Sequence, residues 1–130
     1  MKTIMEWMQL AYLFVGIAGA LGALTRYSVG LILYSHSIFP FATLIVNLVG
    51  CYLLPFLSSA VFHKSRLSPN VQTAITTGFL GSFTTFSAFS VETVKLLQQG
   101  EIIFAVLYVL ISVVGGIVMG NLGWKHEVTR

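Results

Sequence analysis

Four long apolar stretches, separated by short polar segments, constrain the fold of this chain more than any other feature. A helix that crosses the hydrocarbon core of a bilayer needs about 20 apolar residues. Stretches of this kind lie at about residues 10–33, 39–62, 71–97 and 102–124. The chain is 56% hydrophobic and only 8% charged, whereas soluble domains have roughly 25% charged residues. The sequence therefore predicts an all-α membrane protein, built as a bundle of four transmembrane helices.

The connections between the apolar stretches are short, at residues 34–37, 63–70 and 98–101. Short connections make successive helices antiparallel neighbours. A chain of 130 residues has the length of one domain. We therefore expect residues 1–130 to form a single transmembrane domain.

The third apolar stretch differs from the others because its middle is polar. Residues 78–90 contain two glycines and five hydroxyl side chains. Glycine tolerates backbone angles outside the helical region. Carbonyl groups freed by a helix break persist at bilayer depth only where they are buried in protein or face water or an ion. The sequence therefore predicts a broken third helix, which indicates an ion site.

Polar residues on the second and fourth stretches recur at helical spacing. Thr43, Asn47 and Cys51 are four residues apart, and Tyr108 and Ser112 are one turn apart. The amide of Asn47 needs partners inside a membrane. It has two interpretations at this stage: a hydrogen bond between helices, or an NH2 group that donates to an anion.

Phe86, Phe89 and Ser90 share one face of the third helix. Phenylalanines three residues apart commonly do no more than pack. Their ring edges are electropositive, however. Next to hydroxyls and an amide, such edges would stabilise a small anion without holding it so tightly that conduction stops.

Two charged residues lie inside the apolar stretches. Arg26 would either extend to the membrane surface or line an entrance that attracts anions. Glu92 would either form a hydrogen bond near the end of the third helix or line a pore vestibule.

Several function classes are disfavoured by the sequence. Seven cations scattered along the chain do not form the basic patch of a nucleic-acid-binding protein. Neither a Ser/His/Asp constellation nor paired carboxylates is recognisable, so we do not expect an enzyme.

Three motifs carry a resemblance to a known family. Residues 78–92, GFLGSFTTFSAFSVE, resemble the signature of the Fluc (CrcB) family of fluoride ion channels. Residues 43–50, TLIVNLVG, are similar to the motif of that family's second helix, and residues 22–27, GALTRY, to that of its first. The resemblance implies a fluoride-selective channel in a bacterial inner membrane. Passive efflux of F⁻ through it would protect the cell against fluoride toxicity.

The resemblance also implies roles for particular residues. The positions that match the fluoride pore are Asn47, Thr43, Phe86, Phe89, Ser87, Ser90, Tyr108 and Ser112. Gly81 and Thr84 match positions whose backbone carbonyls hold a structural Na⁺ at the centre of a dimer. That dimer is antiparallel, because the family has dual topology.

The charge pattern leaves two kinds of dimer open. Five cations lie on the side of the two termini: Lys2, Lys64, Arg66, Lys125 and Arg130. Arg26 and Lys95 lie toward the other side. By the positive-inside rule this bias favours termini in the cytoplasm, whereas a dual-topology chain should be nearly balanced. We expect a homodimer first, with a heterodimer with a paralogous subunit as the alternative.

The main alternative function is a small proton-coupled multidrug exporter, which is also a four-helix, dual-topology dimer. Such exporters resemble one another in having a membrane-embedded Glu on the first helix. The first apolar stretch here contains no carboxylate, because Glu6 precedes it. The sequence therefore favours the channel.

Overall fold

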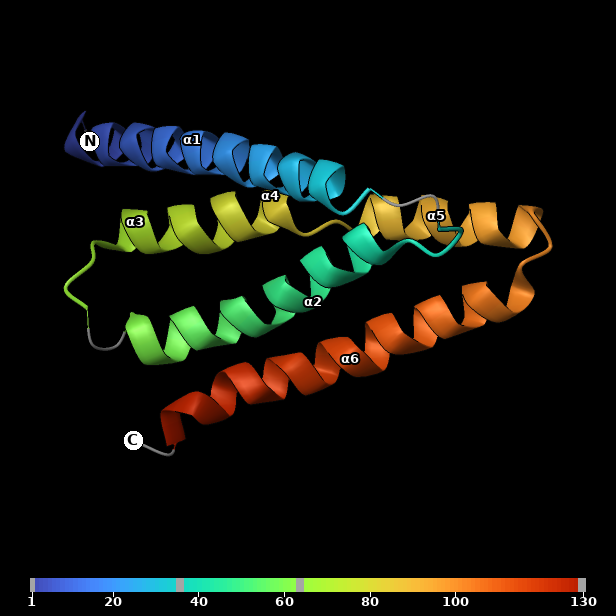
Figure 1. Cartoon of the computed structure of the whole chain (residues 1–130). Coiled ribbons are helices and arrows are strands. Elements are labelled where there is room, and N and C mark those ends of the chain that lie inside the picture. The colour runs from blue at the N-terminus through green and yellow to red at the C-terminus, as the bar shows by residue number, and fades with distance from the viewer. Residues whose placement is uncertain (1, 35–36, 63–64, 129–130) are drawn as a thin grey trace.

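The computed structural model describes residues 2–34, 37–62 and 65–128, and every regular element in these ranges is a helix (Figure 1). In chain order the elements are α1 (Lys2–Ile32), α2 (Phe41–Phe56), η1 (Leu57–Val61), α3 (Pro69–Thr73), η2 (Ala74–Leu80), α4 (Gly81–Phe83), α5 (Phe86–Gln98) and α6 (Ile102–Val128). The two η elements are π-helices. The prediction of an all-helical bundle is confirmed.

The chain runs along the bundle four times, and both termini lie at the same end (Figure 1). The first pass, α1, packs on η2 and α4, whereas α2 and α5 pack on α6. The turn at residues 99–101, between α5 and α6, lies at the opposite end from the termini. Of the cations that entered the topology argument, Lys64 and Arg130 lie outside the described residues.

Three segments of the described chain are long and apolar enough to cross a membrane. They are Met8–Ile32, Phe41–Ser59 and Ile102–Lys125, and they overlap the ranges expected at 10–33, 39–62 and 102–124. The remaining expected range, 71–97, is divided among α3, η2, α4 and α5, none of which reaches 18 residues.

Two prolines shape the second pass. Pro40 occupies the N-cap position of α2, and Pro55 lies inside that helix near its end. Proline has no N–H and its ring crowds the preceding turn, so it disturbs the regular ladder of hydrogen bonds. The helix continues beyond Pro55 in the wider π form of η1.

The turn between α5 and α6 depends on one glycine. Gly100 has a φ of +79°, and it is the one described residue with positive φ. The N–H of the next residue, Glu101, donates to the carbonyl of Leu96 across the turn at 2.9 Å. Such a glycine ends a helix cleanly, so α6 starts at Ile102 and runs back along α5.

The interior of the bundle is small, and the outside is apolar. One buried cluster contains Val46, Leu80 and Phe83, and a second contains Leu44, Leu96, Ala105 and Tyr108. Large apolar side chains remain exposed on the outer faces, among them Leu24, Ile103 and Ile117. An apolar surface of this extent suits contact with membrane lipid or with another subunit.

Candidate functional site

The backbone leaves the helical conformation at two consecutive residues between α4 and α5. Thr84 has φ −79° and ψ 157°, and Thr85 has φ −150° and ψ 122°. Both residues are therefore extended, and α5 begins anew at Phe86. This interruption falls within residues 78–90, the polar part of the third apolar stretch.

Asn47 of α2 binds the interruption with both ends of its amide. Its Nδ2 donates to the carbonyl of Thr85 at 3.0 Å, and its Oδ1 accepts from the Thr85 N–H at 2.8 Å. The amide thus replaces the helical acceptor that the Thr85 N–H has lost, and it adds a donor to the Thr85 carbonyl. The interhelical hydrogen bond considered for Asn47 is present, and because an NH2 group has two hydrogens, one remains for another acceptor.

Thr85 caps the N-terminus of α5. Its Oγ1 accepts from the N–H of Ala88 at 3.2 Å and lies 3.2 Å from Oγ of Ser87. An N-cap hydroxyl satisfies one of the free N–H groups in the first turn of a helix. Thr85 is buried, with 8% of its surface exposed, so water does not readily take over this role.

The interruption deprives the carbonyls of residues 81–84 of their helical donors. In a continuous helix the N–H of Thr85 would donate to Gly81, and that of Ala88 to Thr84. Here Thr85 donates to Asn47, and Ala88 donates to the Thr85 side chain. The carbonyls of Gly81 and Thr84 are therefore among those released from the helical pattern. Among the described residues, no cluster of His, Cys, Asp or Glu could hold a metal ion.

A recess of about 390 Å³ lies on one side of the interruption. Its lining residues come from α2, α5, α6 and the interruption itself: Asn47, Gly50, Cys51, Leu54, Thr84, Thr85, Phe86, Phe89, Ser112 and Val113. The rings of Phe86 and Phe89 have centroids 5.8 Å apart. None of the lining side chains carries a formal charge at neutral pH. The lining offers an amide, hydroxyls, a thiol and ring edges as weak partners for an anion.

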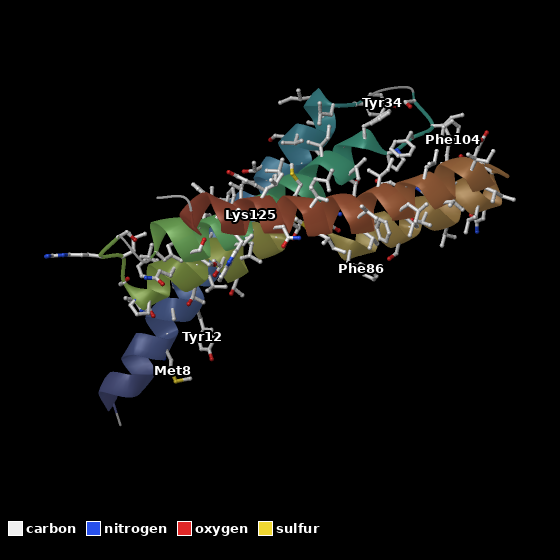
Figure 2. The ribbon with its side chains drawn as sticks, turned by 90° about the horizontal axis from the view of Figure 1, so that it is seen from below. Met8, Tyr12, Tyr34, Phe86, Phe104 and Lys125 are labelled. Atoms are coloured by element: carbon white, nitrogen blue, oxygen red, sulfur yellow. The ribbon has the colours of Figure 1, made fainter. Side chains whose placement is uncertain are left out.

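Phe86 lies at the surface of the bundle. Its side chain is 80% exposed, and Figure 2 shows it on the outside of the helices. Phe89 is partly buried and packs on Tyr108, with ring centroids 5.2 Å apart. One wall of the recess is therefore open to whatever surrounds the chain.

A second recess, of about 290 Å³, contains Arg26. It is lined by residues of α1, α2, α5 and the interruption: Ala23, Arg26, Tyr27, Gly30, Ala42, Thr43, Val46, Thr85 and Ala88. Thr85 lines both recesses. The interruption thus forms part of the boundary between a recess with a cationic side chain and one without a charge.

Glu92 joins three helices through hydrogen bonds. Its Oε1 accepts from Oγ1 of Thr43 at 2.7 Å, and its Oε2 accepts from the hydroxyl of Tyr108 at 2.7 Å. Tyr108 is fully buried. Hydrogen bonds of this length to a carboxylate are strong, so the cluster ties α5 to α2 and α6. Thr43 also lines the recess of Arg26.

The structure therefore brings only some of the expected pore residues together. Asn47, Phe86, Phe89 and Ser112 share the first recess, whereas Ser87, Ser90 and Tyr108 line neither recess. The hydroxyl of Ser90 donates to the carbonyl of Phe86 at 2.9 Å. Sequence reasoning did not single out Thr85, although a hydroxyl residue just before a helix start is the usual N-cap signal.

Comparisons with known proteins agree on one family. The family described as "CrcB-like protein, Camphor Resistance (CrcB)" matches residues 13–124. A protein of Listeria innocua named "Fluoride-specific ion channel FluC 2" is 53% identical over 116 residues, which cover 89% of both chains. "Fluoride-specific ion channel FluC 1" of Bacillus cereus is 50% identical over 89% of this chain and 86% of its own. The protein of the same name from Desulfitobacterium hafniense is 54% identical over 80% of this chain and 91% of its own. With the match spanning most of its length, the chain belongs to the CrcB family.

Proposed function

We propose that this chain is a subunit of a fluoride-selective channel that lets F⁻ leave the cell passively across the bacterial cell membrane. Relatives about half identical to it are named fluoride-specific ion channels. The chain is a multi-pass membrane protein and not an enzyme. Efflux of F⁻ through it protects the cell against fluoride toxicity.

One observation carries this proposal: the uncharged recess beside the interruption. Asn47, Phe86, Phe89 and Ser112 line it together. A fixed cation would hold a small anion too firmly to release it, whereas an NH2 hydrogen, a hydroxyl and ring edges bind weakly and in succession. The recess therefore has the chemistry of a passage.

The Arg26 recess supplies the approach to that passage. Positive charge in a water-filled entrance raises the local concentration of anions. Arg26 lies there with Thr43, whose hydroxyl is bound to Glu92. We assign Arg26 and Glu92 to this vestibule, with Tyr108 holding the second oxygen of Glu92.

The open wall at Phe86 supports a second copy of the chain as the other half of the pore. A ring that is 80% exposed beside the recess leaves the passage unlined on that side. A partner subunit would cover it and would bring the neighbouring hydroxyls of Ser87 and Ser90 to the pore. We propose an antiparallel, dual-topology homodimer. A heterodimer with a paralogous subunit is the alternative. The numbers in the names FluC 1 and FluC 2 of two relatives are consistent with paralogous members of the family.

We further propose that the third pass, α3 to α5, is a fourth transmembrane span, broken at Thr84 and Thr85. This pass runs the length of the bundle (Figure 1). The released carbonyls of Gly81 and Thr84 would hold a structural Na⁺ at the dimer centre. When bound, Na⁺ would supply positive charge that offsets the carbonyl dipoles there.

The test is fluoride efflux from liposomes that contain only this purified chain. We expect rapid release of F⁻ when valinomycin lets K⁺ follow, with Cl⁻ retained in matched liposomes. Release without valinomycin would contradict a passive, electrogenic channel. If the folded chain alone releases nothing but releases F⁻ together with a paralogous subunit, the heterodimer replaces the homodimer; silence in both preparations would refute the channel.

The exporter alternative finds no support. The span Met8–Ile32 contains no carboxylate that could exchange protons. The relatives reported above carry channel names.

A further inference from the structure

The interruption is held from α2 at two consecutive residues. Asn47 binds the backbone of Thr85. One turn further along α2, Gly50 lies against Thr84. The two residues of α2 therefore contact both residues of the third pass whose backbone is extended.

The orientation of the Thr84 side chain is fixed by a hydrogen bond. Its Oγ1 donates to the carbonyl of Leu80 at 2.9 Å, and its N–H donates to the same carbonyl at 3.0 Å. With Oγ1 directed back along the chain, the methyl group Cγ2 points at α2. It reaches the position of the missing side chain of Gly50, where an added Cβ would overlap it.

Gly50 differs from three other closely packed glycines in what it meets. An added Cβ would run into backbone atoms of Phe79 at Gly22, of Val15 at Gly78 and of Tyr52 at Gly123. At Gly50 the nearby atoms are all side-chain atoms, from Thr84 and Phe83. At Gly115 an added Cβ would also meet side-chain atoms only, but these are the far end of the flexible Leu48 side chain. The fit at Gly50 is therefore a fit between one absent side chain and one methyl group.

We infer that Gly50 is a positioning residue of the channel: it forms a notch that receives the Thr84 methyl and so fixes where the third pass is interrupted. The inference rests on the proposed function. A side chain at position 50 would displace Thr84, and Thr84 could give way only by breaking its bond to Leu80 or by shifting its backbone. A backbone shift would move the Thr84 carbonyl and would pull Thr85 away from Asn47.

The inference is tested by adding a methyl group at position 50 and removing one at position 84. Gly50→Ala adds the clashing methyl group, and the double variant Gly50→Ala/Thr84→Ser removes the group that it clashes with, while the serine keeps the hydroxyl that binds Leu80. Gly120→Ala is the matched control, because its Cβ would lie 3.7 Å from the Cys51 carbonyl, in ordinary contact. Each variant is measured by fluoride efflux from liposomes and by thermal unfolding in detergent, with Na⁺ and with N-methylglucamine.

We expect Gly50→Ala to lower fluoride efflux by about tenfold or more, as overpacking at a rigid contact does. We expect it to lower the melting temperature. We also expect the melting temperature of this variant to be the same in Na⁺ and in N-methylglucamine, whereas that of the unmodified chain is higher in Na⁺. The double variant should recover efflux to within about threefold of the unmodified chain, by the same relief of overpacking. If Gly50→Ala alone does not yield folded protein, recovery of folded protein by the double variant is the expected result.

Three results would overturn the inference. Gly50→Ala could match Gly120→Ala in efflux and unfolding, the serine could fail to restore either property, or neither Gly50 variant could fold. Failure of the proposed function looks different, because the unmodified chain itself would then release no F⁻. In that case the order of melting temperatures among the same variants still decides whether Gly50 receives the Thr84 methyl.

Discussion

The fourth pass and the third pass, which pack together along α5, differ in how their backbone groups are satisfied. The fourth, α6, is one uninterrupted helix of 27 residues from Ile102 to Val128. The third is divided into α3, η2, α4 and α5, with Thr84 and Thr85 extended between the last two. A continuous helix satisfies its own N–H and C=O groups, apart from those at its ends.

This difference decides what each pass can contribute. From α6 the site receives side chains, chiefly the hydroxyls of Tyr108 and Ser112. From the third pass it receives backbone groups as well, and these need partners elsewhere. Asn47 and the side chain of Thr85 provide them. The irregular backbone is thus stabilised by a few polar contacts, and we expect the molecule to be most sensitive to substitution at these contacts.

The largest effect is expected for Asn47→Asp. The carboxylate can still accept from the Thr85 N–H, but it cannot donate to the Thr85 carbonyl. It also places a negative charge in the recess that the anion would cross. We expect fluoride efflux from liposomes to fall to the level of protein-free vesicles.

The matched control is Gln99→Glu, the same change from amide to carboxylate at an exposed position in the turn after α5, outside the candidate spans. Efflux should stay within about twofold of the unmodified chain, as is usual for surface substitutions. Normal efflux through Asn47→Asp would remove Asn47 from the pore. Equal losses at both positions would show that the contact that holds the interrupted pass is no more sensitive than an exposed position.

Much of the contrast between the passes can be predicted from the sequence. Apolar stretches of bilayer length, with charges near their ends, predict helices without any knowledge of which other segments pack against them. The glycines and hydroxyls of residues 78–90 indicate the part of the chain where regular helix is weakest. These are local properties, so a single sequence suffices for them.

The partners of the irregular pass could not be predicted in the same way. The Asn47–Thr85 pair and the Thr43–Glu92 pair join residues 38 and 49 positions apart. The π-helix η2 also escaped prediction, because its seven residues have no distinctive local pattern. Tertiary packing selects such features, and hydrophobic periodicity does not report them.

The comparison is sharpened by Tyr108→Phe, a change on the continuous helix that acts on the interrupted pass. The hydroxyl of Tyr108 donates to Glu92 Oε2 at 2.7 Å in a fully buried position. Removing it leaves one carboxylate oxygen without that donor. Hydrogen bonds to charged groups contribute roughly 1.5–3 kcal/mol, so we expect the free energy of unfolding in mixed micelles to fall by about 2 kcal/mol.

Tyr27→Phe is the control for this variant, because Tyr27 is 66% exposed on α1. Its unfolding free energy should change by less than about 0.5 kcal/mol. A double-mutant cycle with Glu92→Gln separates the contact from other effects of each change. Additive losses in that cycle would mean that the two side chains do not interact. The Tyr108 hydroxyl of α6 would then not stabilise the interrupted pass through Glu92.

The smallest effect is expected at the N-cap of α5. Thr85→Ala removes the oxygen that accepts from the Ala88 N–H, whereas Thr85→Ser keeps it. Loss of an N-cap hydroxyl costs about 1 kcal/mol, so the alanine variant should lose about that much unfolding free energy and the serine variant much less. Thr93→Ala is the control within the same helix, because the hydroxyl of Thr93 only returns to the carbonyl of Phe89, a bond that adds little to a helix. If the losses at positions 85 and 93 are equal, α5 needs no cap of its own, and the interruption is held by Asn47 and Gly50 alone.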